Sequence, residues 1–226
     1  MVQDRIKLLL SALAKVVLGV ALVGALLFLP AGTLAFYGAW RLCAVLFVPM
    51  LAMGVVMFIL SPDLLRRRLA SKEERATQRG VVGYAGLLFV VSFVVAGLDF
   101  RFGWSHMPQW LVWGAVAIFL LGYALYGEVM RENVWLSRNI TVAEGQQVVT
   151  TGLYGIVRHP MYISTIFMFL AMPLILGSYW AVLSMMLYIP VIIIRIKDEE
   201  QLLVNDLEGY QDYCTKVRWR LLPYVW

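Results

Sequence analysis

The stretch MYISTIFMFLAMPLILGSYWAVLSMMLYIPVIII, residues 161–194, is 34 residues long and carries no charged side chain. A helix crosses the roughly 30 Å hydrocarbon core of a bilayer with about 20 residues, so this stretch is too long for one crossing. Leu176, Gly177 and Ser178 interrupt it near its middle, where a glycine favours a turn. We therefore predict a hairpin of two short membrane helices, with Pro173 and Pro190 as kinks.

Four more uncharged stretches precede this hairpin, at residues 16–40, 42–62, 80–98 and 102–127. The chain is 62% apolar and only 15% charged, and its mean hydropathy is +0.78. Soluble domains of this size rarely have such a composition, which is typical of integral membrane proteins. The sequence therefore predicts an all-α polytopic membrane protein with about six transmembrane helices, at residues 10–30, 36–61, 80–98, 108–128, 161–176 and 179–195.

Lysine and arginine are distributed unevenly between the two sides of this layout. Of the 19 Lys and Arg residues, only Arg41 and Arg101 fall on the side opposite to the N-terminus. This asymmetry is the positive-inside signature, and it predicts cytoplasmic termini in a cell inner membrane or an endoplasmic-reticulum-type membrane. The net charge of +5 then requires no nucleic-acid partner. The densest group of cations is expected to touch anionic lipid headgroups, and it consists of Arg66, Arg67, Arg68, Lys72, Arg75 and Arg79.

Two polar segments flank the hairpin, and an even number of crossings returns both to the same face of the membrane. The first, residues 131–160, reads RENVWLSRNITVAEGQQVVTTGLYGIVRHP. Apolar residues on both sides of Glu144 and Gly145 predict a short β-hairpin, and Pro160 is expected to begin a helix. Two interpretations of Arg158 stay open: a cation that anchors a re-entry turn at the lipid boundary, or one wall of a site.

The second polar segment, residues 195–226, reads RIKDEEQLLVNDLEGYQDYCTKVRWRLLPYVW. Arg195 and Glu199 are four residues apart, so they share one face of a helix that leaves the bilayer. A surface ion pair and an interfacial aromatic belt are the simpler explanations of its charged and aromatic residues. An apolar stripe is expected to dock a cytosolic C-terminal helix onto the membrane body, and it consists of Leu202, Leu203, Leu207 and Tyr210.

The cysteines and histidines predict neither a disulfide nor a metal site. Cys43 lies in a predicted span and Cys214 in the polar tail, so the two are not expected to meet. His106 and His159 are far apart in the sequence and lack partner ligands with the spacing of a zinc site.

Together, the two polar segments resemble the isoprenylcysteine carboxyl methyltransferase family of membrane enzymes, in its broad prokaryotic branch. The resemblance is carried by VVTTGLYGIVRHPMY at 148–162, RIKDEEQLL at 195–203 and GYQDYCTKVRWRLLP at 209–223. It implies transmembrane helices in residues 1–130 and a catalytic region in residues 131–226, made of a cytosolic loop, the helical hairpin and the C-terminal helix. Related branches of this family methylate phospholipid amines or small thiols.

The resemblance also implies S-adenosylmethionine as methyl donor, held by the loop before the hairpin and the helix after it. Arg195 aligns with an arginine that holds the carboxylate of the acceptor. The preceding Asp198 leaves the register of the acidic pair open, and Ile163 and Ser164 replace the family's usual small residues. The expected donor contacts, with Arg158 added on chemical grounds as a partner for the donor's carboxylate, are Val148, Val149, Tyr154, Arg158, His159, Pro160, Tyr162, Glu199 and Glu200.

Methyl transfer from a sulfonium depends on positioning and needs neither a metal nor a covalent enzyme intermediate. A carboxylate acceptor is already ionised, so Arg195 would only have to orient it. An amine acceptor would need a base, for which His159 is the candidate. Both chemistries stay open, with Arg195 and His159 as the expected catalytic residues. In either case the acceptor is a lipophilic small molecule or a lipidated substrate from the bilayer.

Two other classes of protein compete with this interpretation. Membrane sterol reductases, which bind NADPH, carry a similar R-H-x-x-Y element, but Pro160 and the run Asp198-Glu199-Glu200 favour the methyltransferase. Transporters place ionisable residues near the middle of the membrane, and the predicted spans are almost free of them. A membrane scaffold without enzymatic activity remains an alternative.

Overall fold

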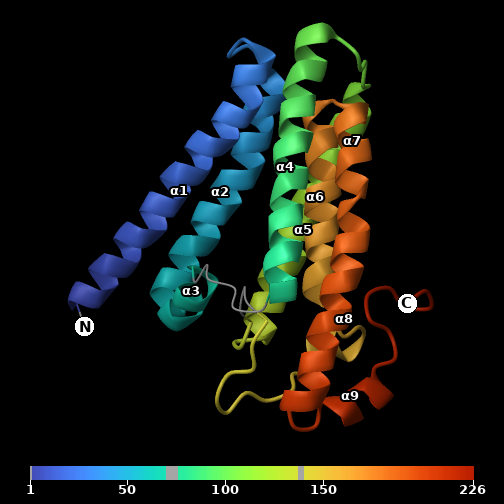
Figure 1. Ribbon diagram of the computed structural model, residues 1–226. Coiled ribbons are helices and arrows are strands. Elements are labelled where there is room, and N and C mark those ends of the chain that lie inside the picture. Colours follow the sequence, from blue (N-terminus) through green and yellow to red (C-terminus); the bar gives the residue numbers. More distant parts are fainter. Residues whose placement is uncertain (1, 70–75, 137–139) are drawn as a thin grey trace.

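The computed structural model describes residues 2–69, 76–136 and 140–226, and among these it contains helices, turns and loops but no strand (Figure 1). Three cations of the sequence-based topology, Lys72, Arg75 and Arg138, lie outside the described residues. The helices are α1 (Val2–Ala31), α2 (Tyr37–Leu60), α3 (Pro62–Leu69), α4 (Ala76–Phe102), α5 (Gln109–Glu132), the 3₁₀ turn η1 (Gly152–Gly155), α6 (Pro160–Leu176), α7 (Tyr179–Met186), α8 (Tyr188–Asp206) and α9 (Tyr210–Lys216).

Among the described residues, α1, α2, α4 and α5, and α7 together with α8, have the length and composition of membrane spans. Within the described residues, five helical segments are long and apolar enough to cross a bilayer, at Gln3–Ala31, Tyr37–Leu60, Arg79–Phe102, Gln109–Glu132 and Tyr179–Asp206. The remaining predicted crossing is α6, which is apolar but only 17 residues long. Large aliphatic side chains such as Leu18 and Leu29 are exposed on α1, as contact with lipid requires. The structure thus confirms a polytopic all-α membrane protein.

The helical hairpin forms where the uncharged stretch predicts it. Gly177 ends α6 with φ = 83°, a left-handed conformation that costs glycine no steric strain. Ser178 then caps α7, because its Oγ accepts a hydrogen bond from the Ala181 amide at 3.1 Å. Leu187 separates α7 from α8 just before Pro190, which has no N–H to donate to the preceding turn. The second arm is longer than predicted, because α8 continues to Asp206.

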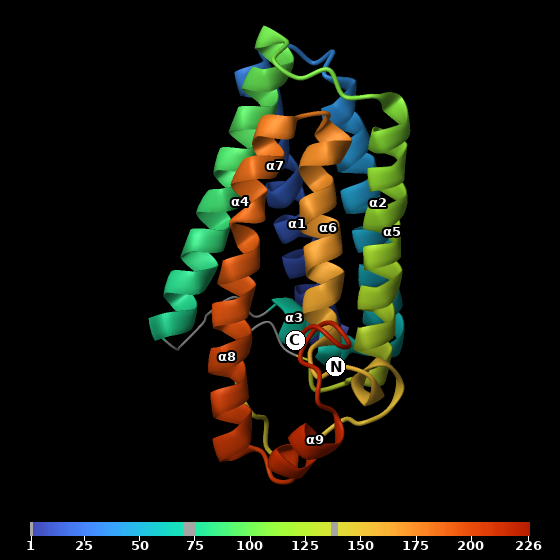
Figure 2. The same ribbon diagram turned by 90° about the vertical axis from the view of Figure 1, so that its right-hand side faces the viewer.

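Glycines let the helices of the bundle approach each other closely. Figure 2 shows α6 in the middle of the bundle, beside α5. A Cβ at Gly122 of α5 would lie 2.7 Å from Met168 Cγ and 3.1 Å from the Ser164 carbonyl oxygen of α6. On α4, a Cβ at Gly97 would lie 2.7 Å from the Leu27 carbonyl oxygen of α1. Such contacts suit membrane helices, whose association depends on close packing.

A buried carboxylate fixes the turn of the hairpin at the end of the molecule away from the two termini (Figure 1). Asp99 of α4 is 2% exposed and accepts hydrogen bonds from the amide and the Oγ of Ser105, each at 2.7 Å, and from Ser178 Oγ. Ser105 Oγ in turn accepts from the Tyr179 amide at 3.1 Å. These contacts join α4, the α4–α5 loop and the hairpin, so this cluster holds the hairpin in place against α4.

The predicted β-hairpin around Glu144 and Gly145 is wrong. The turn itself forms, with Gly145 at φ = 71° and a 3.0 Å hydrogen bond from the Gln146 amide to the Ala143 carbonyl, but residues 140–150 contain no strand. Val142 and Val148 instead pack against Tyr210 and Tyr213 of α9. The apolar side chains that suggested strand pairing are partly buried against this cluster.

The two polar segments meet at one end of the bundle, as the even number of crossings predicts. Both termini lie at that same end (Figure 1). The apolar stripe of the second segment is divided between two helices, because Leu203 lies on α8 whereas Tyr210 begins α9. Leu203, Leu207 and Tyr210 belong to one hydrophobic cluster, of which Leu202 is not part.

Candidate active site

An open cavity lies where the two polar segments meet, and its empty space is about 820 Å³, with the solvent at its mouth included. Pro160 and Glu200 are the two predicted site residues that do not line it. Pro160 begins α6, and Glu200 lies behind the cavity wall. The predicted site residues that do line the cavity are Val148, Val149, Tyr154, Arg158, His159, Tyr162, Arg195 and Glu199.

The wall formed by Arg158 and His159 is held in place by the C-terminal tail. The Arg158 amide donates to the Trp219 carbonyl and the His159 amide donates to the Arg220 carbonyl, each at 2.9 Å. Both side chains are buried, with exposed fractions of 9% and 5%. Arg158 is therefore a buried part of the cavity wall rather than an exposed cation.

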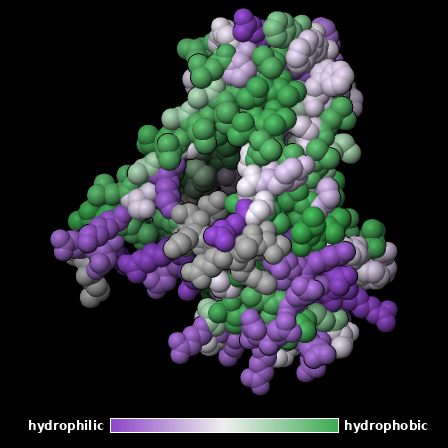
Figure 3. Space-filling model, in the orientation of Figure 1, coloured by the Kyte–Doolittle hydropathy of each residue, from purple (hydrophilic) through white to green (hydrophobic). Residues whose placement is uncertain are grey.

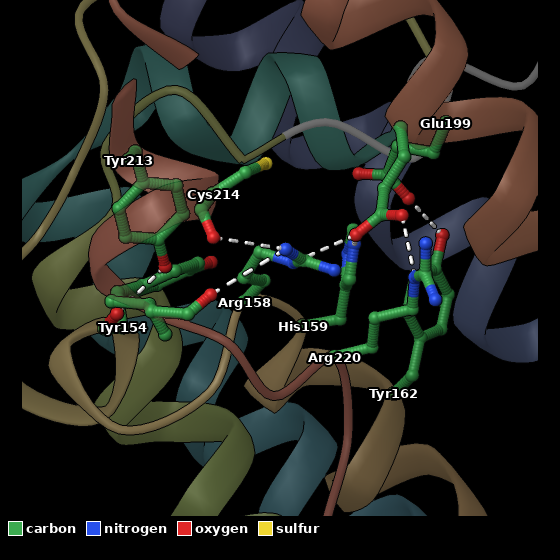
Figure 4. Close-up of polar contacts among 10 residues, drawn as sticks. Tyr154, Arg158, His159, Tyr162, Glu199, Tyr213, Cys214 and Arg220 are labelled. Atoms are coloured by element: carbon green, nitrogen blue, oxygen red, sulfur yellow. Dashed lines mark hydrogen bonds and ion pairs between the residues drawn. The ribbon is translucent and has the colours of Figure 1, made fainter. Parts of the chain in front are cut away.

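The Glu200 carboxylate contacts three side chains on the side of this wall that faces away from the cavity. Its Oε1 pairs with Arg158 Nε at 2.8 Å and lies 3.3 Å from His159 Nε2. Its Oε2 accepts a hydrogen bond from Arg220 Nε at 2.6 Å. Figure 4 shows how Arg158, His159 and Arg220 converge. Charge-assisted contacts of this kind are stronger than neutral hydrogen bonds, so Glu200 couples α8, the start of α6 and the tail.

Tyr162 links the arginine and the carboxylate that the sequence placed on one face of α8. Its hydroxyl donates to Glu199 Oε2 at 2.5 Å (Figure 4) and accepts from Arg195 Nε at 3.0 Å. The shared face of Arg195 and Glu199 is thus confirmed, and the phenol of Tyr162 lies between the two charged groups. This arrangement presents a carboxylate and a guanidinium to the cavity with their orientations fixed.

Tyr154 contributes a second buried phenol on the opposite side of the cavity. Its hydroxyl accepts a hydrogen bond from Asn133 Nδ2 at 3.0 Å. Its carbonyl oxygen accepts from the Tyr213 hydroxyl at 2.6 Å (Figure 4). Burial raises the pKa of Tyr154 to about 12, with the Asn133 hydrogen bond acting in the opposite direction. The phenol therefore stays protonated at physiological pH.

Several residues that line the cavity were not predicted as site residues. Polar side chains among them come from the first polar segment: Asn133, Thr141, Gln146 and Gln147. Amides can both donate and accept hydrogen bonds, as recognition of a purine or a ribose requires. The sequence signal that would have indicated these polar lining residues is the pair Gln146-Gln147, directly after the Glu144-Gly145 turn.

Residues 110–208 match the family model of the phospholipid methyltransferases. The matched segment is less than half of the chain, but it runs from α5 to the end of α8 and contains all of the predicted site residues. The match supports a membrane methyltransferase and agrees with the broad group that the sequence resembles. It does not single out isoprenylcysteine as the acceptor.

A sterol-metabolising protein shares part of this sequence as well. A Delta(14)-sterol reductase of Mus musculus is 34% identical to this chain over 90 residues. The similarity covers 38% of this chain and only 22% of the reductase. The chain thus matches about a fifth of the length of this curated relative, so the similarity concerns a shared segment and not the whole protein.

Proposed function

We propose that this protein transfers a methyl group from S-adenosylmethionine to a lipid acceptor at the boundary between membrane and cytoplasm. The observation that carries the proposal is one cavity lined by both polar segments, whose lining, apart from Tyr210 and Tyr213, lies inside the stretch that matches the methyltransferase family. A site at this boundary can receive a polar donor from water and an apolar acceptor from the bilayer.

The lining of the cavity suits S-adenosylmethionine. This donor carries an ammonium and a sulfonium, a carboxylate, ribose hydroxyls and a purine. Glu199 is placed to accept hydrogen bonds from the ammonium or the ribose, and the amides of Gln146 and Gln147 suit the purine. Tyr154 and Tyr162 offer aromatic rings to a cationic or purine group.

When bound, the donor supplies an electrophilic methyl group: the bond from acceptor to methyl forms while the carbon–sulfur bond breaks, and the sulfur takes up the electron pair. The residues of the chain then act by orientation and charge. Arg195, fixed by Tyr162, is placed to orient an anionic acceptor such as the carboxylate of an isoprenylcysteine. For an amine acceptor a proton must be removed first, and His159 is the proposed base.

The test is a tritiated-methyl transfer assay of the purified protein in lipid nanodiscs. A farnesyl-cysteine analogue, phosphatidylethanolamine and a small thiol are offered in parallel. We expect transfer to at least one of them, and we expect Arg195→Ala to raise the KM of the acceptor while the affinity for S-adenosylmethionine stays the same. Failure to bind S-adenosylmethionine and to methylate any of the three acceptors would refute the proposal.

The similarity to a sterol reductase favours NADPH-dependent reduction as the second candidate. The R-H-x-x-Y element of that class corresponds here to Arg158, His159 and Tyr162, all of which line the cavity. Isothermal titration with S-adenosylmethionine and with NADPH separates the two functions. Binding of NADPH alone would replace the methyltransferase proposal with this one.

A further inference from the structure

Tyr210, the first residue of α9, lines the cavity but lies just beyond residues 110–208, the stretch that matches the methyltransferase family. It is 4% exposed, and its hydroxyl is buried without a hydrogen-bond partner among the described residues. Buried polar groups in folded proteins are nearly always hydrogen-bonded, because an unpaired one loses its contacts with water and gains none in return. The Tyr210 hydroxyl therefore needs a partner from outside the described part of the chain.

The other described tyrosines that line the cavity have paired hydroxyls. The Tyr213 hydroxyl, three residues further along α9, donates to the Tyr154 carbonyl at 2.6 Å. The Tyr162 hydroxyl donates to Glu199 Oε2 at 2.5 Å, and the Tyr154 hydroxyl accepts a hydrogen bond from a side-chain amide at 3.0 Å. Tyr210 thus differs from its neighbours in the cavity by one unsatisfied polar atom.

The phenol of Tyr210 has a hydrogen to donate at physiological pH. Burial raises the pKa of Tyr210 well above its ordinary value, and the charge of Glu200 raises it further. The phenol therefore stays protonated. Its hydrogen can rotate about the bond between the ring and the oxygen, so it can turn to an acceptor on any side. What the hydroxyl lacks is an acceptor for this hydrogen.

The charges around Tyr210 favour a neutral acceptor over an anionic one. The carboxylates of Glu200 and Glu199 both raise the pKa of Tyr210, whereas Arg158 lowers it more weakly than either. The electrostatic potential at the hydroxyl is thus negative on balance, and a further negative charge beside it would be repelled. A ring nitrogen is an acceptor without such a charge.

The corner of the cavity next to Tyr210 suits a flat ring with apolar faces. Further members of its hydrophobic cluster also line the cavity, namely Val148, Leu203, Leu207 and Tyr213. Val148 directly follows the pair Gln146-Gln147, whose amides line the same cavity and can form hydrogen bonds at the edge of such a ring. Apolar faces and a polar edge are the properties of a purine.

This corner is open to a ligand from water rather than from the bilayer. Tyr210 follows the last candidate membrane span, Tyr179–Asp206. The end of the molecule that contains α9 in Figure 1 carries most of the hydrophilic surface that is visible in Figure 3. In the proposed reaction the water-soluble component is S-adenosylmethionine, and its adenine has neutral ring nitrogens.

We propose that the Tyr210 hydroxyl donates a hydrogen bond to a ring nitrogen of the adenine of S-adenosylmethionine, whose ring packs against Leu203 and Leu207. This inference rests on the proposed function and adds a binding residue beyond the matched stretch. Recognition of this kind is selective, because a purine without that nitrogen leaves the hydroxyl unpaired.

The experiment measures ligand affinity and the stability of the ligand-free protein in Tyr210→Phe, with Tyr213→Phe as the matched control on the same helix. The ligand is S-adenosylhomocysteine, which remains when the donor has lost its methyl group. Three analogues, in each of which one ring nitrogen of the adenine is replaced by C–H, are titrated in parallel. Isothermal titration in detergent gives the Kd, and thermal unfolding gives the midpoint.

Tyr210→Phe should bind S-adenosylhomocysteine about threefold to tenfold more weakly, because a neutral hydrogen bond is lost. Its ligand-free midpoint should equal or exceed that of the wild type, because the substitution removes an unpaired buried hydroxyl. Tyr213→Phe should lower the midpoint, because the Tyr154 carbonyl loses its donor. The wild type should bind one analogue about threefold to tenfold more weakly than the parent ligand, whereas Tyr210→Phe should bind these two equally.

An unchanged affinity of Tyr210→Phe for S-adenosylhomocysteine would overturn the inference, because the hydroxyl would then have another partner, such as water. A ligand-free midpoint of Tyr210→Phe below that of the wild type would overturn it as well, and so would the same pattern of analogue affinities in both proteins. All three results leave the proposed function intact. A wild type that binds neither S-adenosylmethionine nor S-adenosylhomocysteine would instead overturn the proposed function, and this inference with it.

Discussion

Glu199 and Glu200 are neighbours on α8, yet they face different surroundings. Successive side chains on a helix are separated by about 100° of rotation, so both cannot face one cavity equally. Glu199 lines the cavity and accepts from Tyr162, whereas Glu200 is buried against Arg158, His159 and Arg220. We therefore propose that Glu199 contacts the donor, whereas Glu200 supports the cavity wall.

Glu199→Gln should weaken binding of S-adenosylmethionine about tenfold, because one charge-assisted hydrogen bond becomes neutral. The thermal midpoint of the protein should change little, since Glu199 is only partly buried. Isothermal titration and thermal unfolding in detergent measure the two quantities. Unchanged donor affinity would show that Glu199 faces the cavity without touching the donor.

Glu200→Gln should destabilise the protein by about 3 kcal/mol, because Arg158 loses its carboxylate partner in a buried position. Glu208→Gln, at an exposed position just after α8, is the control and should leave the thermal midpoint unchanged. Thermal unfolding followed by circular dichroism gives both values. Equal midpoints for the two variants would contradict the role of Glu200 in joining α6, α8 and the tail.

The different surroundings of Glu199 and Glu200 could not be predicted from the sequence. The family resemblance placed both of them on the donor, and the preceding Asp198 left the register undecided. What separates them is the position of partners far along the chain: Tyr162 on one side of α8, and Arg158 and Arg220 on the other. Such partners are set by tertiary packing and not by the spacing within RIKDEEQLL.

The close packing of α5 against α6 requires that one position of α5 carry no side chain. A Cβ at Gly122 would lie within 3.3 Å of the Met168 amide nitrogen and closer still to Met168 Cγ and the Ser164 carbonyl. At Gly114, on the same helix, a Cβ would meet no atom within 4 Å. The two glycines thus lie on the same helix but differ in packing.

Gly122→Ala should destabilise the protein by about 1–2 kcal/mol, because α5 or α6 must move to admit the methyl group. Gly114→Ala should be neutral or stabilising by up to about 1 kcal/mol, because alanine has the higher helix propensity. Thermal unfolding of both variants in the same detergent tests the difference. A Gly122→Ala variant as stable as Gly114→Ala would show that the two helices are not in close contact there.

The hairpin was predictable because its signals are local and strong: the length of an uncharged run, a glycine–serine break and a proline. The short helix α3 was not, since its leucines are only Leu64, Leu65 and Leu69, which are too few to establish a helical period. The false β-hairpin had correct turn residues. Its flanking Val142 and Val148 are partly buried against the cluster that includes Tyr210 and Tyr213, more than 60 residues away in sequence, and a local pattern contains no information about that contact.

Seen as a whole, the molecule has the Asp99 cluster and the cavity at opposite ends of its long axis. The Asp99 cluster ties α4 to the hairpin at one end, while the cavity, α3 and both termini lie at the other (Figure 1). Asp99→Asn should therefore lower the thermal midpoint, at a cost of about 1–3 kcal/mol, without changing the affinity for S-adenosylmethionine. Parallel thermal unfolding and titration test this independence, and a loss of donor affinity in the folded variant would refute it.

The end that holds the cavity should face the cytoplasm, because the cations concentrate there and the donor is a polar cytosolic molecule. In a background of Cys43→Ser and Cys214→Ser, single cysteines at two exposed loop positions, His106→Cys and Glu144→Cys, report on the two ends. A membrane-impermeant maleimide applied to intact cells should label position 106 and leave position 144 unlabelled until the membrane is permeabilised. The reverse pattern would place the cavity outside the cell, where Glu199 and Arg195 would have no access to the donor, and the proposed function would fail with the topology.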